Sequence, residues 1–164
     1  MTRKRYPLGT LLRLREHRTE AARQVLLERQ RQTQVCRDQC IQIESEITAL
    51  RHQRAHHRAQ LLAAPAPGMS WPTTLEQRER HIDHLADLAT AARARLSQAK
   101  QALQQAEQAQ DEARTAYFQA RSRQEALEKR RDVWRREQRI LEDRREEAAA
   151  EELLLGRRLP LMSS

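Results

Sequence analysis

The stretch Ala64-Pro65-Ala66-Pro67-Gly68-Met69-Ser70-Trp71-Pro72 separates two long segments, residues 10–63 and 73–155, that contain neither proline nor glycine. Proline removes a backbone donor and clashes with the preceding helical turn, so a helix cannot continue through this stretch. We call residues 64–72 the hinge. Two long helices joined by a break of this length predict an antiparallel hairpin.

A hydrophobic repeat with alternating steps of three and four residues runs through both segments, and we call its positions the seam. The steps average 3.5 residues, which is the period of a coiled coil, and 17 of the 24 positions after the hinge are apolar. The sequence therefore predicts an all-α fold, a two-helix antiparallel coiled-coil hairpin. Before the hinge the seam comprises Leu8, Leu12, Arg15, Thr19, Ala22, Leu26, Arg29, Thr33, Cys36, Cys40, Ile43, Ile47, Leu50, Arg54, His57 and Leu61. After the hinge it comprises Leu75, Arg78, Ile82, Leu85, Ala89, Ala92, Leu96, Ala99, Leu103, Ala106, Gln110, Ala113, Tyr117, Ala120, Gln124, Leu127, Arg131, Trp134, Gln138, Leu141, Arg145, Ala148, Glu152 and Leu155.

Local signals mark the ends of the two helices. Pro7 suits a first helical turn, and Thr73 with Glu76 forms a Thr-x-x-Glu capping box. Gly156 suits the position just after a helix, and Pro160 prevents its resumption. We therefore expect one coiled-coil domain over residues 1–164, with the following parts: helix 1 at about residues 7–63, helix 2 at about residues 73–155, and a short tail at residues 156–164.

The arms of the predicted hairpin are unequal, roughly 85 Å and roughly 120 Å at 1.5 Å per residue. Antiparallel pairing places Leu8 opposite about residue 128, so we expect residues from about 129 to 155 to lack a partner within the chain. The seam of this overhang keeps an apolar row that includes Trp134 and Leu141. Docking onto a partner protein is one interpretation, and a dimer seam or scattered surface apolar residues are the others.

Positive charge is concentrated at the end of the predicted hairpin that carries both termini. The chain has a net charge of +8, and residues 1–31 hold nine Lys or Arg against three Glu. Such an end suits nucleic acid, anionic lipid or an acidic protein surface. Because no aromatic side chains alternate with the arginines, an acidic protein pocket is favoured and nucleic acid is not expected. The predicted contact residues are Arg3, Lys4, Arg5, Arg13 and Arg15.

The hinge contains two large apolar residues, Met69 and Trp71. Trp71 could fold over Leu61, Leu62 and Leu75 and close the end of the hairpin. Alternatively, the two side chains form an exposed apolar tip that a partner protein binds. The sequence leaves both interpretations open.

The sequence shows no pattern of residues that would support catalysis. It contains no glycine-rich phosphate loop, nucleophile elbow or pair of carboxylates in a pocket. His52 and His56 are four residues apart and would lie near His81 and His84, which is ligand spacing, but no supporting carboxylate pattern accompanies them. We therefore expect no metal, no cofactor and no enzymatic activity.

The cysteines and the hydropathy pattern bear on the cellular compartment. Cys36 and Cys40 occupy seam positions on one helix face, so we expect small buried thiols in a reducing compartment. No apolar run is long enough to span a bilayer, and Arg13 and Arg15 interrupt the leucines that follow the basic start. These observations predict a cytoplasmic protein without direct membrane insertion.

The opening Tyr6-Pro7-Leu8-Gly9-Thr10-Leu11-Leu12-Arg13-Leu14-Arg15-Glu16 resembles the start of the type III secretion stalk proteins of the YscO (SctO) family and of their flagellar relative FliJ. These proteins also open with a Leu-Leu-x-Leu-Arg-Glu run. Their length, unequal hairpin arms and basic, aromatic-poor composition are similar as well.

This resemblance implies a central stalk that inserts into the hexameric type III secretion ATPase, with its far end toward the export gate. It also implies binding of secretion chaperones and a position at the cytoplasmic face of the inner membrane. From the residues alone, two other classes stay open: a homodimerising coiled-coil scaffold and a basic nucleic-acid-binding coiled coil.

Overall fold

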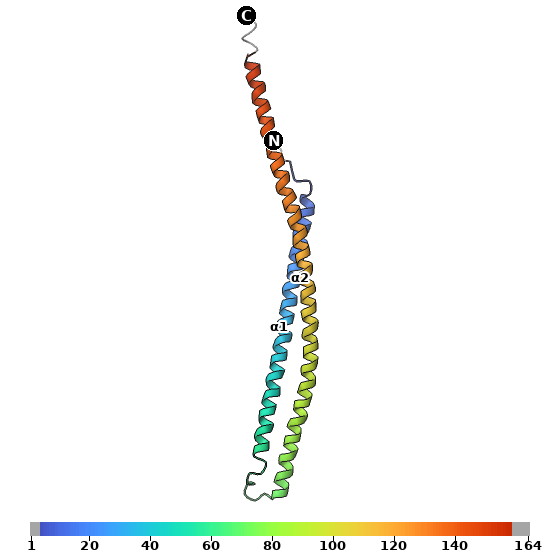
Figure 1. Ribbon diagram of the computed structural model, residues 1–164, viewed down its shortest axis with the longest axis vertical. Coiled ribbons are helices and arrows are strands. Elements are labelled where there is room, and N and C mark those ends of the chain that lie inside the picture. The colour runs from blue at the N-terminus through green and yellow to red at the C-terminus, as the bar shows by residue number, and fades with distance from the viewer. Residues whose placement is uncertain (1–3, 159–164) are drawn as a thin grey trace. The chain divides into compact units, whose positions relative to one another are not determined.

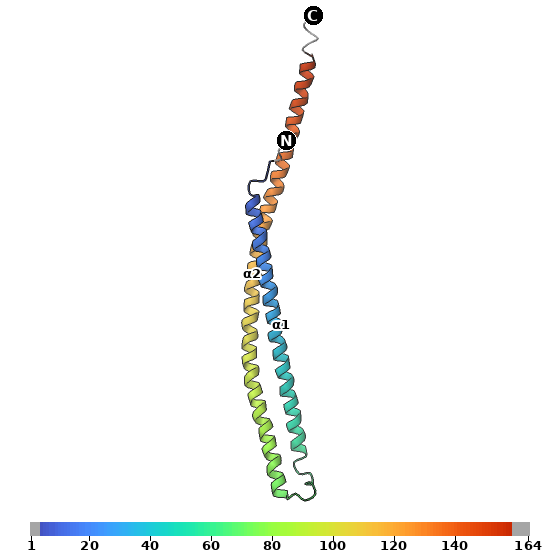
Figure 2. The same ribbon diagram turned by 180° about the vertical axis from the view of Figure 1, so that it is seen from behind.

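The computed structural model describes residues 4–158, which form two helices, α1 (Gly9–Ala59) and α2 (Trp71–Arg158). The helices contain 51 and 88 residues, and no strand occurs in the described part of the chain. Figures 1 and 2 show that α1 and α2 lie side by side and run in opposite directions in the part of the chain next to the loop that joins them. The predicted all-α, two-helix antiparallel hairpin with unequal arms is confirmed. Two residues used in the sequence analysis, Arg3 and Pro160, lie outside the described residues.

The N-terminal boundaries of both helices differ by two residues from those predicted. Pro7 lies in a turn before α1, where the Gly9 N–H donates to the Tyr6 carbonyl at 3.0 Å. Helix α2 begins at Trp71, and the Ser70 carbonyl accepts the Thr74 N–H at 3.1 Å. Ser70 therefore caps α2 in place of Thr73, because a proline in the first turn needs no amide partner and lets the helix start earlier.

The C-terminal boundaries also differ from those predicted. Helix α1 ends at Ala59 and a turn follows it, so the loop between the helices covers residues 60–70. Helix α2 continues through Gly156 to Arg158. The only described glycine with a positive φ is Gly68, so Gly156 keeps a helical conformation instead of ending the helix.

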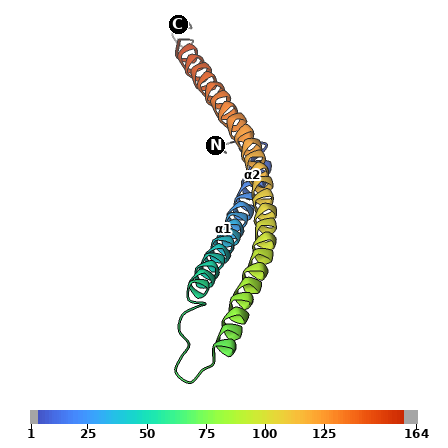
Figure 3. The same cartoon turned by 60° about the horizontal axis from the view of Figure 1, so that its bottom comes forward.

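The loop is fixed by a tight turn and by one arginine. The Met69 N–H donates to the Ala66 carbonyl at 3.1 Å, and Gly68 has a φ of 86°, as a type II turn with Pro67 in second position requires. The Arg78 guanidinium lies 3.0 Å from the Leu61 carbonyl and 2.7 Å from that of Ala63. A cation there satisfies carbonyls that the end of α1 leaves free. Figure 3 shows this loop as the irregular segment between the two helices.

The chain divides into two compact units, which we call the loop unit (Val25–Arg114) and the terminal unit (Met1–Gln24 with Thr115–Ser164). In the loop unit every seam position of α2 from Leu75 to Ala113 is buried or partly buried, and Ala92 is fully covered. Of the α1 seam positions in this unit, Arg29 is the one that is exposed. The predicted seam is therefore the packed face of both helices.

A buried hydroxyl and two ion pairs fix the alignment of the helices in the loop unit. Thr33 is 1% exposed, and its Oγ1 lies 3.3 Å from the Ala106 carbonyl of α2. At the edges of the seam, Arg37 pairs with Glu107 at 3.5 Å, and Arg95 with Glu46 at 2.7 Å. The hydrogen bond from Arg95 lowers the pKa of Glu46 and raises that of Arg95. These contacts hold α1 antiparallel to α2 in one register.

In the terminal unit, pairing extends further along α2 than the sequence predicts. The seam positions of α2 stay partly or fully buried through Gln138, and every described residue from 139 to 158 is exposed. The unpaired segment therefore begins near residue 139 instead of residue 129. The reason is the segment before α1: Tyr6 reaches Trp134, and the ring centroids are 5.6 Å apart.

Candidate partner-binding surfaces

The residues that the sequence predicts for partner binding lie in two places. The terminal unit holds Lys4, Arg5, Arg13, Arg15, Trp134 and Leu141, and the loop unit holds Met69 and Trp71. Each group forms a surface of the molecule. The side chains of the terminal unit line two open hollows.

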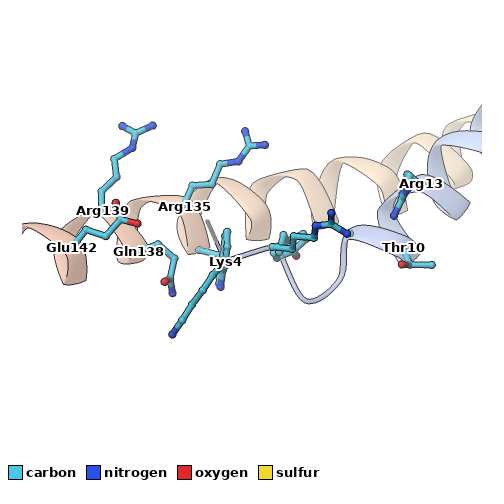
Figure 4. Close-up of a pocket in the computed structure, with 11 residues that line it drawn as sticks. Lys4, Thr10, Arg13, Arg135, Gln138, Arg139 and Glu142 are labelled. Carbon is cyan, nitrogen blue, oxygen red and sulfur yellow. The ribbon is translucent and has the colours of Figure 1, made fainter. Parts of the chain in front are cut away.

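A cationic groove of about 880 Å³ lies between the start of α1, with the residues before it, and the part of α2 from Trp134 to Glu142. Its positive lining consists of Lys4, Arg5, Arg13, Arg135 and Arg139. Glu142 is the one carboxylate among its lining residues, so the groove has an excess of four positive charges. Figure 4 shows Arg13 projecting from α1 while Arg135, Arg139 and Glu142 project from α2. Such a groove suits a segment rich in carboxylates.

The predicted basic group does not act as one surface. Arg13 lines the cationic groove, whereas Arg15 is partly buried at a seam position and does not line it. The spacing of two residues accounts for the difference, because neighbours two apart point in different directions on a helix. Lys4 and Arg5 precede α1 and are exposed. Of the four predicted cations that the structure describes, Lys4, Arg5 and Arg13 are therefore the ones that it brings together.

A second hollow of about 450 Å³ adjoins the Tyr6–Trp134 contact. Pro7, Leu8 and Val133 also line it, and the charged side chains around it are Lys129, Arg130 and Glu137. Val133 is 48% exposed. We call this feature the apolar hollow, since its floor is formed by aromatic and aliphatic side chains.

The expectation that Trp134 lacks a partner within the chain is wrong. Its indole packs against Tyr6, and the Tyr6 hydroxyl lies 3.5 Å from the Leu127 carbonyl. The expectation paired only the residues of the two helices with each other, and Tyr6 precedes α1. Leu141, one heptad further on, is 42% exposed, as expected for a residue beyond the reach of α1.

The loop unit exposes an apolar tip beside its loop. Met69 is 43% exposed and Trp71 is 45% exposed. Leu62, which would lie beneath Trp71 if Trp71 closed the end of the hairpin, is 77% exposed. The structure therefore favours the exposed tip over closure of the hairpin end by Trp71. Two residues were missed by sequence reasoning, namely Arg78 as a cap and Tyr6 as an aromatic contact.

The structure also shows where the histidines and cysteines lie. His57, not His52 or His56, meets His81 across the helices, with ring centroids 4.5 Å apart. Within residues 4–158 no group of three potential ligands gathers to hold a metal ion. Cys36 and Cys40 are buried free thiols. No described helix is long and apolar enough to cross a membrane.

Comparison with known proteins gives one family and one similar solved structure. The structure is described as that of a YscO homologue, CT670 from Chlamydia trachomatis, which is 20% identical, with a TM-score of 0.75 over 99% of this chain and 100% of that chain. At that identity the likeness shows the fold. No curated protein matches. The YscO-like protein family matches residues 3–161, which is nearly the whole chain, and the chain therefore belongs to the YscO-like family.

Proposed function

We propose that this chain is a non-enzymatic stalk of a type III secretion export apparatus, at the cytoplasmic face of the inner membrane. It engages the hexameric secretion ATPase, links it to the export gate and binds secretion chaperones. The observation that carries the proposal is the YscO-like family match over residues 3–161. The antiparallel helix pairs of both units support it, because they offer long surfaces and no enclosed site.

The cationic groove is the surface that we assign to the ATPase. A ring of identical subunits presents the same groups repeatedly around an axis, and an asymmetric stalk contacts these subunits unequally. Unequal contacts shift the nucleotide affinity of individual subunits, which is a coupling between two binding events. The positive groove would meet carboxylates of the ring, and this attraction would also speed association. The stalk itself supplies no bond-making chemistry.

The proposal is tested with the purified cognate secretion ATPase and the full-length chain. Changing Lys4, Arg5 and Arg13 to Gln removes three positive charges of the groove. We expect about a tenfold loss of affinity for the ring, since exposed ion pairs contribute roughly 0.5 kcal/mol each. Stimulation of ATP hydrolysis should fall in parallel.

A matched variant controls for net charge. Arg51, Arg93 and Lys100 are exposed cations of the loop unit. Changing these three to Gln removes the same charge, and we expect ring binding to stay within twofold of the unmodified chain. If both triple variants lost the same affinity for the ring, the attraction would be non-specific and the cationic groove would not be the binding surface. A complete lack of ring binding by the unmodified chain would refute the proposed partner.

A further inference from the structure

We propose that two copies of this chain associate by antiparallel pairing of the exposed part of α2, around a two-fold axis that passes between Ile140 and Leu141. The pairing covers residues from about 130 to about 151 of each copy. It goes beyond the proposed function, because it requires no secretion component.

The first observation is a helical segment without a partner. All described residues from 139 to 158 are exposed, among them Ile140 at 51%, Leu154 at 61% and Leu155 at 60%. An isolated helix of about 20 residues is marginally stable in water, and most helices are stabilised by packing an apolar face. Packing against another surface would therefore stabilise this segment.

The second observation is a division of charge along the segment. Residues 129–139 hold six Lys or Arg and two Asp or Glu, a net charge of +4. Residues 142–152 hold two Arg and six Asp or Glu, a net charge of −4. Ile140 and Leu141 separate the two blocks. An antiparallel second copy would place each block opposite the block of opposite sign.

The third observation is the pattern on one face of the helix. Arg130, Glu137, Arg144 and Glu151 follow one another at intervals of seven residues, which keeps them on one face. Their signs alternate. Each is followed, three and four positions later, by a pair on the same face. These pairs are Val133 with Trp134, Ile140 with Leu141, Glu147 with Ala148, and Leu154 with Leu155.

A two-fold axis between Ile140 and Leu141 brings residues equidistant from it face to face. Glu137 then meets Arg144 of the second copy, and Arg130 meets Glu151 of the second copy. Because the arrangement is isologous, each of these ion pairs forms twice. Ile140 meets Leu141 and Val133 meets Ala148 in the same alignment, and Trp134 lies opposite Glu147 of the second copy. The ion pairs and the contacts of Ile140, Leu141 and Val133 therefore agree on one register.

The apolar hollow is consistent with this alignment. Arg130, Val133, Trp134 and Glu137 all line it, and these residues belong to the proposed face. The small side chain of Ala148 from the second copy would lie opposite Val133. The apolar hollow, with a volume of about 450 Å³, therefore lies on the face that would contact the second copy.

Other occupants satisfy only part of the pattern. A parallel second copy would set the basic block against the basic block, which is unfavourable. An acidic partner would complement residues 129–139 and repel residues 142–152, and a basic partner would do the reverse. A second antiparallel copy complements both blocks.

The test measures the solution mass of the full-length chain by light scattering across a concentration series. The monomer mass is 19.3 kDa, and we expect the mass to rise toward twice that value with concentration and to fall again with added salt. Glu137→Arg alone and Arg144→Glu alone each create like-charge contacts at both ends of the pair. We expect either variant to dissociate at least tenfold more readily.

Mixing the two variants provides the decisive arm. A copy with Glu137→Arg is basic at both positions, and a copy with Arg144→Glu is acidic at both, so the mixture should regain the dimer. The double variant Glu137→Arg, Arg144→Glu should also dimerise by itself. Glu146→Arg, in the same acidic block but off the proposed face, should leave dimerisation within about twofold. A chain that stays monomeric at all concentrations overturns the proposal, as does a dimer that ignores the single reversals or a mixture that does not associate.

Discussion

The loop unit and the terminal unit share one hydrophobic repeat, yet only the loop unit is closed along its whole length. Of the described apolar side chains that are buried, eight lie in the loop unit and two, Leu12 and Leu127, lie in the terminal unit. In the loop unit both helices supply seam residues. In the terminal unit α1 ends its contribution while α2 continues to Arg158. A coiled-coil repeat therefore forms a packed core where two helices carry it and leaves apolar side chains exposed where one does.

The chemistry of the seam follows the same division. In the loop unit α2 contributes Ile82, Leu85 and small alanines, whereas the terminal unit places Gln124, Arg131 and Gln138 in one row of its seam. Long polar side chains tolerate a half-solvated position, since their stems pack and their ends reach water. Such a row costs stability within one chain but suits a surface that alternates between water and a partner.

The largest effect that separates the units should come from truncating an apolar residue in each. Leu85 is 4% exposed in the loop unit, and Leu153 is 72% exposed in the terminal unit. We expect Leu85→Ala to cost about 2–4 kcal/mol of unfolding free energy, and Leu153→Ala less than about 0.5 kcal/mol. Thermal or urea unfolding followed by circular dichroism measures both. Similar losses for the two variants would contradict the division into a closed and an open unit.

A smaller loss should follow removal of the arginine that caps α1. Arg78 lies within hydrogen-bonding distance of the Gln60, Leu61 and Ala63 carbonyls, and Arg78→Gln would leave the Leu61 and Ala63 carbonyls to water. We expect a cost of about 1–2 kcal/mol, because a charged donor near a helix C-terminus is lost. Arg80→Gln is the control, since Arg80 makes an exposed ion pair within α2. Equal melting temperatures for Arg78→Gln and Arg80→Gln would mean that the Arg78 contacts do not stabilise the fold.

The contact between Tyr6 and Trp134 should be worth still less, because it closes only one side of the terminal unit. A double-mutant cycle with Tyr6→Ala and Trp134→Ala isolates it. We expect a coupling energy of about 1 kcal/mol, the usual range for an aromatic pair. Strict additivity of the two single losses would mean that Tyr6 does not hold Trp134 in solution.

The smallest effect concerns pH and the Arg95–Glu46 pair of the loop unit. Arg95 lowers the pKa of Glu46 in the folded chain, chiefly through a hydrogen bond. The pair therefore stabilises the fold above the carboxylate's unfolded pKa, and this contribution is lost as pH falls through the lowered folded pKa. We expect the melting temperature of Glu46→Gln to fall slightly less on acidification than that of the unmodified chain. Identical falls would show that the pair is fully screened.

The sequence was sufficient for the fold because the seam is periodic over its whole length. Positions such as Leu12, Cys36 and Ile82 were assigned to the packed face by spacing alone, and the structure buries them. Membership of the YscO-like family was likewise anticipated from the run at Leu11–Glu16. The helix starts were off by two residues, since a capping box at Thr73 and a serine cap at Ser70 compete within one turn.

What the sequence could not provide was contact made outside the helices. Tyr6 precedes α1, so heptad counting gives it no position, and its packing on Trp134 depends on the path of the chain before Gly9. Arg78 was counted only as a polar seam residue. Its long side chain turns toward the loop, and the heptad spacing does not encode that direction. The partner-binding roles of Met69, Trp71 and Leu141 stay predictions.

The central claim is that the loop unit stabilises the fold and the terminal unit binds the partner. Hydrogen exchange of the full-length chain, with and without the secretion ATPase ring, tests this claim most directly. At a concentration where the chain is monomeric, we expect amides of residues 75–113 to exchange slowly and those of residues 139–158 to exchange fastest. Adding the ring should slow exchange within residues 4–13 and 134–142, which line the cationic groove, and leave residues 75–113 unchanged. Protection confined to the loop unit, or no change anywhere in the terminal unit, would contradict the account.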